Sequence, residues 1–302
     1  MAKFLITVVG PTGIGKTALA IKLAQHYNCE ILSADSRQFF REMSVGTAVP
    51  SAEELAAAPH HFIHHKSISE SYTVGDFEKE ALSTLEKLFT KSDYAILVGG
   101  SGLYIDAILR GLDEFPEVSP EVKELVRSKY QKSGLEYLRK ELQKRDPLYF
   151  ETVDKDNPQR MMRALEVCKS SGRPYSSFLG GTRERNFTPI LIGLEADRKL
   201  LYERINQRVD LMLANGLVEE ARTLISHRDR NALQTVGYRE LFSYFSGDFS
   251  YDFAVSEVKK NTRRFAKRQL TWFRRNPNIK WFDFKADVRE IVSYIDSSAQ
   301  KA

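Results

Sequence analysis

Short apolar runs alternate, in the N-terminal third of the chain, with segments whose apolar residues recur every three or four positions. Residues 3–9 (KFLITVV) form one such run and predict a buried strand, whereas residues 17–27 repeat apolar side chains at helical spacing. The same reasoning predicts a helix over 76–90 and further strands at 29–34, 94–98, 189–194 and 279–283. Buried strands separated by helices are typical of a parallel, doubly wound α/β sheet flanked by helices.

The pattern changes between Pro116 and about Gly181, where Glu, Lys, Arg, Leu and Tyr dominate and no strand-like run occurs. Helices are predicted within this stretch at 120–132, 134–144 and 158–171. Beyond it, helices are predicted at 198–214, 216–226 and 251–275. We therefore expect a discontinuous α/β core, residues 1–115 and 186–302, that carries an inserted all-helical subdomain, residues 116–185.

The predicted helix over 251–275 combines an apolar stripe with a strongly basic remainder. The stripe should pack on the core and comprises Val258, Phe265, Ala266, Trp272 and Phe273. From Lys259 to Lys280 the chain has nine Lys or Arg and no acidic residue. Such a surface suits a nucleic-acid backbone, and a merely solvated basic helix is the alternative. The basic side chains on the helix are Lys260, Arg263, Arg264, Lys267, Arg268, Arg274 and Arg275.

Composition limits the class of protein without choosing its function. The chain has 302 residues, 42% of them hydrophobic, and a net charge of +5 that permits a polyanionic partner without requiring one. No window approaches the roughly 18 apolar residues of a membrane span. The first apolar run also stops at Gly10 and Pro11, short of a signal peptide. The cysteines, Cys29 and Cys168, lack metal-ligand spacing, so we expect a protein of the reducing cytoplasm, with a monomer as the default.

The sequence GPTGIGKT matches the phosphate-binding pattern GxxxxGK[ST] and lies between a predicted strand and a predicted helix. Its glycines let backbone N–H groups turn toward an anion, and the helix N-terminus adds partial positive charge. Lys16 is placed to reach an outer phosphate, and Thr17 is placed to hold Mg²⁺. The predicted diphosphate-binding loop comprises Gly10, Pro11, Thr12, Gly13, Ile14, Gly15, Lys16 and Thr17.

The loop does not identify the group attached to the phosphate, so other residues must do so. In nucleotide hydrolases and kinases, a carboxylate that positions Mg²⁺ usually follows a neighbouring strand, but residues 94–98 run into the glycine-rich segment GGSG. The nearest candidate is Asp35, at the end of the second predicted strand and therefore on the sheet edge that carries the loop. Asp35 is either a base or metal partner facing the loop, or an ordinary turn residue.

Six motifs then occur in a recognisable order: GPTGIGKT, SADSRQ at 33–38, GGSGLYI at 99–105, NPQRMMRALEV at 157–167, VGYRE at 236–240 and RRFAKRQLTWFR at 263–274. Over about residues 5–285 the chain resembles the tRNA dimethylallyltransferases, or tRNA isopentenyltransferases. The resemblance implies a P-loop NTPase-like fold, Mg²⁺ as cofactor, and dimethylallyl diphosphate and tRNA as substrates. The implied reaction transfers the dimethylallyl group to N6 of the adenosine immediately 3′ of the anticodon and releases diphosphate.

The resemblance also assigns roles to individual residues. Asp35 is implied as the general base. Lys16, Thr17 and Ser101 are implied as the other catalytic residues, although threonine is usual in the family at position 101. Arg204 and Arg208, four apart on a predicted helix, are candidates for the diphosphate, and an ordinary surface pair is the alternative. A flipped adenosine and its anticodon stem-loop are expected to contact Asp35, Ser36, Arg37, Gln38, Ser101, Lys123, Gln159, Arg160, Met161, Met162, Arg163, Gly237, Tyr238, Arg239, Lys267, Arg268, Trp272 and Arg274.

Two other functions compete with this interpretation. A small-molecule or nucleoside kinase would bind ATP in the loop and use Asp35 as its base, but glycine at 99 and the basic, aromatic C-terminal helix argue against it. An RNA-binding P-loop switch protein is the second alternative, but it would give no function to Asp35 or to the segment GGSGLY. The histidine cluster HHFIHH at 60–65 is better explained by exposed or loop-packing histidines than by a zinc site.

Overall fold

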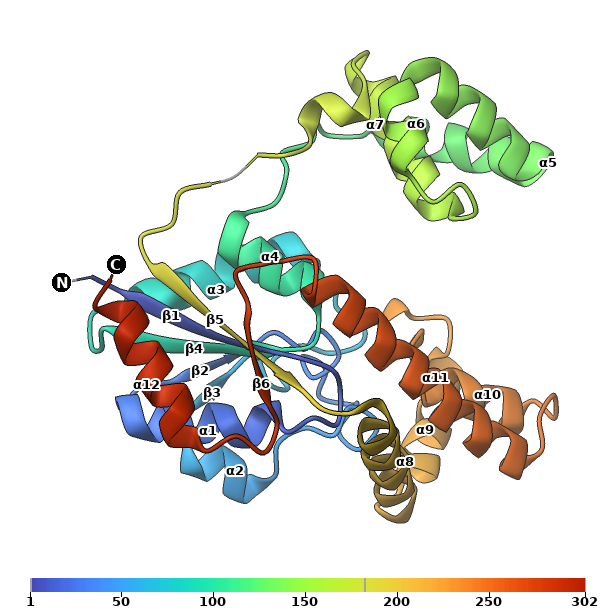
Figure 1. Ribbon diagram of the computed structural model, residues 1–302. Coiled ribbons are helices and arrows are strands. Elements are labelled where there is room, and N and C mark those ends of the chain that lie inside the picture. The colour runs from blue at the N-terminus through green and yellow to red at the C-terminus, as the bar shows by residue number, and fades with distance from the viewer. Residues whose placement is uncertain (1, 182, 302) are drawn as a thin grey trace. The chain divides into compact units, whose positions relative to one another are not determined.

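The computed structural model describes residues 2–181 and 183–301 (Figure 1). The chain divides into two compact units, each with a hydrophobic core of its own. The first unit comprises Met1–Leu109 and Arg185–Ala302, and the second comprises Arg110–Glu184. The helical insertion expected at 116–185 overlaps this second unit.

Within the described residues, six strands of the first unit form one parallel sheet in the order β3-β2-β4-β1-β5-β6. All six residues of β1 are buried, because this strand lies between β4 and β5 with helices on both faces. The predicted parallel, doubly wound sheet is therefore confirmed. The strands are β1 (Phe4–Val9), β2 (Ile31–Ser33), β3 (His60–His61), β4 (Tyr94–Gly99), β5 (Thr188–Glu195) and β6 (Lys280–Asp283).

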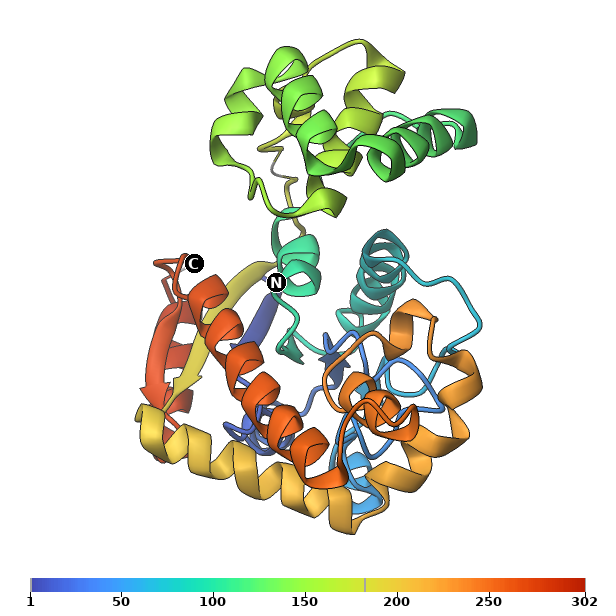
Figure 2. The same ribbon diagram turned by 90° about the vertical axis from the view of Figure 1, so that its right-hand side faces the viewer.

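Helices cover both faces of the sheet (Figures 1 and 2), and a hydrophobic cluster lies on each face. Ile6 of β1 packs with α1 and α12 on one face, and its neighbour Leu5 packs with α3 and α4 on the other. Successive strand residues point to opposite faces, so one strand contributes to both clusters. The helices around the sheet are α1 (Lys16–Tyr27), α2 (Ala52–Ala57), α3 (Val74–Leu88), α4 (Gly102–Arg110), α8 (Arg198–Ala214), α9 (Leu217–Thr223), α10 (Tyr238–Phe245), α11 (Tyr251–Phe273) and α12 (Val288–Ala299).

The second unit is helical, with α5 (Pro120–Arg145), α6 (Pro147–Thr152) and α7 (Pro158–Ser171). Gly134 interrupts α5 with non-helical dihedral angles, φ 62° and ψ −159°, which agrees with the two helices predicted there. Proline opens each of these helices and a side chain caps each N-terminus, Asn157 in the case of α7. Val126, Leu138 and Leu165 are fully buried in the core of this unit.

The predicted strands and helices are confirmed with shifted ends, but six strands and α-helices of the described residues were not predicted, namely β3, α2, α4, α6, α10 and α12. The strand expected at 29–34 is only three residues long, and the helix expected at 216–226 ends at Thr223. A signal for α12 was present in the sequence, since Asp287 caps it and Ile291 and Ile295 are four apart. None of the helices in residues 2–181 and 183–301 combines the length and apolar character needed to cross a membrane.

A buried ion pair fixes the point at which the chain re-enters the first unit. The Arg185 guanidinium lies 2.7 Å from Glu78 Oε1 and donates to the carbonyl oxygens of Ala107 and Ile108 at the end of α4. The side chains of Arg185 and Glu78 are only 10% and 9% exposed. Removing one partner of such a pair leaves the other charge desolvated without a counter-charge.

We expect Glu78→Gln to lower the free energy of unfolding by about 3 kcal/mol, because the Arg185 guanidinium loses its counter-charge while the shape of the side chain is kept. Urea denaturation followed by circular dichroism measures this change. Glu86→Gln, at an exposed position of the same helix, is the matched control and should shift stability by no more than about 0.5 kcal/mol. Equal stability of the two variants would contradict the prediction.

Candidate functional site

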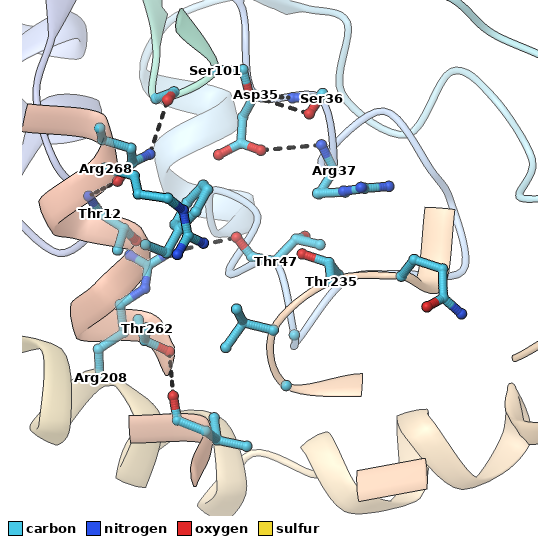
Figure 3. Close-up of a pocket in the computed structure, with 18 of the residues that line it drawn as sticks. Thr12, Asp35, Ser36, Arg37, Thr47, Ser101, Arg208, Thr235, Thr262 and Arg268 are labelled. Atoms are coloured by element: carbon cyan, nitrogen blue, oxygen red, sulfur yellow. Dashed lines mark hydrogen bonds between the residues drawn. The ribbon is translucent and has the colours of Figure 1, made fainter. Parts of the chain in front are cut away.

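Three turns, each following a parallel strand, meet at one edge of the sheet. The predicted diphosphate-binding loop, residues 10–17 and called the phosphate loop below, follows β1. The turn with Asp35 follows β2, and Gly100 and Ser101 follow β4. Parallel strands end at the same edge, so the loops that follow them converge there. Figure 3 shows Thr12, Asp35 and Ser101 around one pocket at this edge.

The phosphate loop depends on glycines in backbone conformations that other residues rarely adopt. Gly13 and Gly15 have φ values of 79° and 106°, and α1 begins directly after Gly15. A Cβ atom at Gly10 would lie 2.7 Å from the carbonyl oxygen of Leu194. The side chain of Ile14 is buried in the core, so Ile14 offers a ligand only backbone atoms.

Lys16 lies in the wall of a cavity of about 480 Å³ beside this loop, and its ammonium donates to the Pro11 carbonyl oxygen at 2.9 Å. Burial lowers the pKa of Lys16 to about 8, while the charge of Asp35 acts to raise this pKa and that of Arg208 to lower it further. Thr17 lines the same cavity. An anion bound here would therefore stabilise the ammonium form of the lysine.

Asp35 is held in a short hydrogen-bonded turn. Its Oδ1 accepts a hydrogen bond from the backbone N–H of Arg37 at 3.1 Å, and the backbone N–H of Asp35 itself faces the Ser33 hydroxyl at 3.4 Å. The backbone N–H of Ser36 donates to Ser101 Oγ at 3.1 Å, which ties this turn to the one after β4. The Asp35 carboxylate faces the open pocket in Figure 3.

A second cavity, of about 600 Å³, lies on the other side of Asp35. Apolar and aromatic side chains supply much of its wall, among them Tyr104, Met212 and Trp272. A large cavity with apolar walls and a few convergent polar groups is the usual form of a small-molecule site. The residues that line both cavities are Thr12, Asp35, Arg208 and Gln269.

The two arginines predicted for the diphosphate both line the cavity beside the phosphate loop. On α8, Arg204 Nε donates to the Gly13 carbonyl oxygen at 2.9 Å, and Arg208 lies one turn further along. Burial lowers the pKa of Arg208, and the charge of Asp35 opposes this shift. Both arginines are half-buried in this wall, so their position is compatible with a diphosphate ligand, and that role stays a prediction.

The turn residues Ser36, Arg37 and Gln38 also lie at the cavities. Ser36 and Arg37 line the larger one, and the Arg37 guanidinium donates to the carbonyl oxygens of Asn231 and Ala232. Gln38 lines the smaller one, where its amide donates to the carbonyl oxygens of the segment 47–48. Much of the hydrogen-bonding capacity of Arg37 and Gln38 is therefore used within the protein.

Tyr238 does not fit the expected contact with RNA. Its side chain is fully buried, and its hydroxyl donates to Glu220 Oε1 at 2.7 Å. Glu220 in turn accepts three backbone N–H bonds from the segment 44–46, so the tyrosine stabilises a loop rather than facing a ligand. The neighbours Gly237 and Arg239 do line the larger cavity.

The apolar stripe predicted on α11 is wrong in part. Val258, Ala266 and Phe273 are buried, but Phe265 is 38% exposed and lines the larger cavity with the half-buried Trp272. Each seven-residue step displaces a side chain by only about 20°, so Val258, Phe265 and Trp272 stay on one side of the helix, and that side borders the larger cavity as well as the core.

The basic residues of α11 lie at its surface. Lys267 and Arg268 are exposed, and Arg268 lines the larger cavity. Just beyond the helix, Arg274 pairs with Glu195 at 3.0 Å and stays 60% exposed. This part of the helix thus presents positive charge at the mouth of the larger cavity.

In the second unit, the residues expected to contact RNA divide by burial. Lys123, Gln159, Arg160 and Arg163 are exposed, and Met162 is half-buried. Met161 is fully buried in the core of this unit, so the expected contact of its side chain with RNA is wrong. A helix face that packs inward cannot also present its side chains to a ligand.

The histidine cluster packs within the protein. His61 Nε2 lies 2.7 Å from Glu30, and the ring of His65 makes edge contacts with Phe39, Phe62 and Tyr72. Burial lowers the pKa of His65 to about 4, which makes it neutral at physiological pH. Among the residues that the structure describes, no group of three or more His, Cys, Asp or Glu side chains is placed to hold a metal ion.

Sequence reasoning missed Gln269, which joins α11 to two of the loops. Gln269 Oε1 accepts from the Thr12 backbone N–H at 2.8 Å, and Gln269 Nε2 donates to the Gly100 carbonyl oxygen at 2.9 Å. A polar residue three positions after Ala266 and four before Phe273, on the buried face of the helix, was the available signal.

Comparison with known proteins identifies the family. A sequence model described as IPP transferase matches residues 38–276. The chain is 62% identical over 300 residues to the tRNA dimethylallyltransferase of Flavobacterium johnsoniae, with 97% of each covered. It is 43% identical to tRNA dimethylallyltransferase 1 of Bacteroides fragilis over 98% of this chain and 99% of that one. The chain belongs to the IPP transferase family.

Solved structures agree with this assignment. The tRNA isopentenylpyrophosphate transferase of Bacillus halodurans superimposes with a TM-score of 0.74 at 35% identity, covering 99% of this chain and 97% of that one. A eukaryotic dimethylallyltransferase acting on tRNA shares the fold, with a TM-score of 0.81 at 24% identity, covering 99% of this chain and 78% of that one.

The lowered pKa of Lys16 predicts how the affinity of the cavity beside the phosphate loop for a diphosphate ester depends on pH. Below pH 8 the Lys16 side chain of the free protein is already an ammonium ion, so its titration should not make the affinity depend on pH. Above pH 8 the lysine must take up a proton on binding, because the bound anion raises its pKa, and affinity should fall by up to about tenfold per pH unit.

Isothermal titration calorimetry from pH 7 to 9.5, in buffers of different ionisation enthalpy, measures both the affinity and the proton uptake. Lys16→Arg keeps its charge over this range and is the control, for which the affinity should stay level. A level profile for the unaltered protein, without proton uptake, would refute the prediction.

Proposed function

We propose that this protein transfers the dimethylallyl group of dimethylallyl diphosphate to N6 of the adenosine immediately 3′ of the anticodon in tRNA. The observation that carries the proposal is the position of Asp35 between two cavities, one beside the phosphate loop and one with apolar walls. The names of the full-length relatives support the same reaction. The diphosphate is assigned to the first cavity and the flipped adenine to the second.

The smaller cavity has the chemistry that a departing diphosphate requires. Backbone N–H groups of the loop, Lys16, Arg204 and Arg208 supply positive charge and hydrogen-bond donors around it. When the allylic C–O bond breaks, the electron pair stays on the diphosphate, so these groups stabilise the leaving group more as its charge grows. Little covalent chemistry is left for the protein to supply.

The Thr17 hydroxyl fits a magnesium ion, because it is a hard oxygen donor in the wall of the same cavity as Lys16. Thr17 and the diphosphate oxygens would hold Mg²⁺ there, and the bound ion would neutralise part of the leaving-group charge. Asp35 and Glu54 also line this cavity, and their carboxylates would be available to orient water around such an ion.

The acceptor is an exocyclic amine whose lone pair is delocalised into the adenine ring, so loss of its proton helps the new N–C bond to form. We assign this proton to Asp35, with the adenine held between Asp35 and the apolar wall that includes Trp272. The N–C bond forms, the allylic C–O bond breaks, and the amine proton moves to the carboxylate. Ser101 holds the Asp35 turn in place through Ser36.

The base must leave the anticodon stack to reach this cavity, at a cost of a few kcal/mol. Phosphate contacts from the basic face of α11, and from Arg160 and Arg163 of the second unit, supply affinity for this step. The polyanionic partner also accounts for the concentration of basic residues between 259 and 280. We propose that the enzyme acts as a cytoplasmic monomer.

A kinase is the weaker candidate. The strand β4 ends in Gly99 rather than in a carboxylate that would position Mg²⁺ and ATP, and the relatives are named as transferases acting on tRNA. Incubation of the protein with radiolabelled dimethylallyl diphosphate, Mg²⁺ and unmodified tRNA separates the two functions. Label in the RNA is the expected result, and phosphate transfer from ATP without such label would favour the kinase.

We expect Asp35→Asn to bind tRNA normally but to lower the single-turnover rate by a factor of about 100 to 10,000, the range typical of a lost general base. The asparagine oxygen can still accept the Arg37 N–H bond, so the turn should keep its shape. Rapid-quench measurement of labelled tRNA gives the rate, and gel-shift titration gives the affinity. A rate equal to that of the unaltered enzyme would exclude Asp35 as the base.

We expect Arg160→Ala combined with Arg163→Ala to weaken tRNA binding by about tenfold or more and to make its salt dependence shallower, because two phosphate contacts are lost. Fluorescence anisotropy at several salt concentrations measures both. Lys129→Ala with Lys132→Ala removes the same charge from α5 of the same unit and serves as the control. If the arginine double variant binds tRNA no more weakly than the lysine double variant, and with the same salt dependence, the two arginines form only a solvated surface.

A further inference from the structure

The side chain of Gln269 lies where α11, the phosphate loop and the turn after β4 come together. The residue is only 6% exposed, and both ends of its amide are engaged. The Thr12 backbone N–H donates to its oxygen, and its nitrogen donates to the Gly100 carbonyl oxygen. One side chain therefore connects three segments that are far apart in the sequence.

The contact with Gly100 leaves no spare room. A Cβ atom on Gly100 would lie 2.2 Å from Gln269 Nε2, so the amide packs directly against a residue that has no side chain. Gln269 also lines both cavities, together with Thr12, Asp35 and Arg208. Its position is thus the boundary at which the donor and the acceptor must meet.

From Gly100 the connection continues to the general base. Ser101 Oγ accepts a hydrogen bond from the Ser36 backbone N–H at 3.1 Å and lies 3.2 Å from the Ser36 hydroxyl. Ser36 follows Asp35 directly in the chain. A continuous path of hydrogen bonds and short chain segments therefore runs from Thr12 of the phosphate loop, through Gln269, to Asp35.

On the solvent side of the same helix, Lys267 and Arg268 are exposed, two residues and one residue before Gln269. A phosphate backbone bound to them rests on the helix that carries Gln269 on its inner face. In a complex with tRNA, the position of α11 would thus depend on the RNA outside and on the phosphate loop inside.

We propose that Gln269 is a positioning residue that joins the RNA-facing helix α11 to the phosphate loop and to the turn of Asp35, and so aligns the amine with the allylic carbon. The inference rests on the proposed function. It assigns to Gln269 the alignment of the two cavities with each other, which is separate from the binding of a ligand in either one. Alignment carries large effects, because a misplacement of about 1 Å can lower a rate about 100-fold. The Thr12 N–H is used by Gln269, so the diphosphate takes its backbone donors from other residues of the loop.

The first test is Gln269→Met, which keeps the length of the side chain and removes both hydrogen bonds. The single-turnover transfer rate should fall by a factor of about 10 to 100, whereas the dissociation constants of tRNA and of dimethylallyl diphosphate should each change by less than about threefold. Thr271→Ala is the matched control, because this exposed hydroxyl on the same helix bonds to the Lys267 carbonyl oxygen within the helix. Its transfer rate should equal that of the unaltered enzyme.

The second test is Gln269→Glu, which separates the two hydrogen bonds. The carboxylate can still accept the Thr12 N–H bond but repels the Gly100 carbonyl oxygen, whereas the protonated acid can donate to it as glutamine does. The rate relative to the unaltered enzyme at the same pH should therefore rise as pH falls from 8 to 6. A purely structural role would leave this ratio independent of pH. If Gln269→Met does not fold, the pH profile of Gln269→Glu decides the matter.

A folded Gln269→Met variant with an unaltered transfer rate would overturn the inference. The inference would also be overturned if Gln269→Met bound tRNA and dimethylallyl diphosphate so much more weakly that the loss of binding explained the whole loss of rate. If the unaltered protein transfers no dimethylallyl group, the proposed function fails, and amide hydrogen exchange then tests the connection by itself. Exchange at Thr12 should be faster in Gln269→Met than in the unaltered protein, and equal exchange rates would show that the connection does not exist.

Discussion

The site depends on one constraint, which is that β1, β2 and β4 run parallel and end together at a crowded sheet edge. A Cβ atom at Gly99, the last residue of β4, would lie 2.4 Å from the carbonyl oxygen of Ala34. No side chain fits there, so the carboxylate that nucleotide hydrolases place after this strand is excluded by packing. Asp35 follows the neighbouring strand β2 instead, and it lines both cavities. Close packing of the strands thus excludes a magnesium-positioning carboxylate after β4, and the carboxylate of Asp35 lies after β2 instead.

Positive charge lines the cavities on both sides of Asp35, but its surroundings differ. The cavity beside the phosphate loop gathers Lys16, Arg204 and Arg208, and the lowered pKa values of Lys16 and Arg208 have burial as their main cause. Cations that have already lost water need less reorganisation when an anion arrives, which is the condition for strong stabilisation of a leaving group. The cavity on the other side combines aromatic side chains such as Trp272 with Arg239 and Arg268, which suits a flat base that is joined to a phosphate backbone.

The walls of the larger cavity are held by contacts that do not themselves face it. Trp272 packs against Gly102, where a Cβ atom would lie 2.3 Å from the indole, and its Nε1 donates to Asp106 at 2.9 Å. The Glu220 carboxylate fixes the segment that includes Gly46 in the wall, and Tyr238 in turn fixes Glu220. The motif VGYRE is therefore informative about function even though its tyrosine is buried.

The sequence by itself determined the parallel sheet, the glycine-rich turn between β1 and α1, the position of Asp35 at the sheet edge and the helical character of the second unit. These features depend on local periodicity and on glycine spacing, which are properties of short segments. The tertiary structure decided the roles of Gln269, Tyr238 and Phe265, because burial and hydrogen bonding there involve residues up to 257 positions apart. A seven-residue spacing placed Phe265 inside, yet the helix turns that side chain toward the cavity. Local patterns specify elements, whereas the partner of each side chain is set only when the elements pack together.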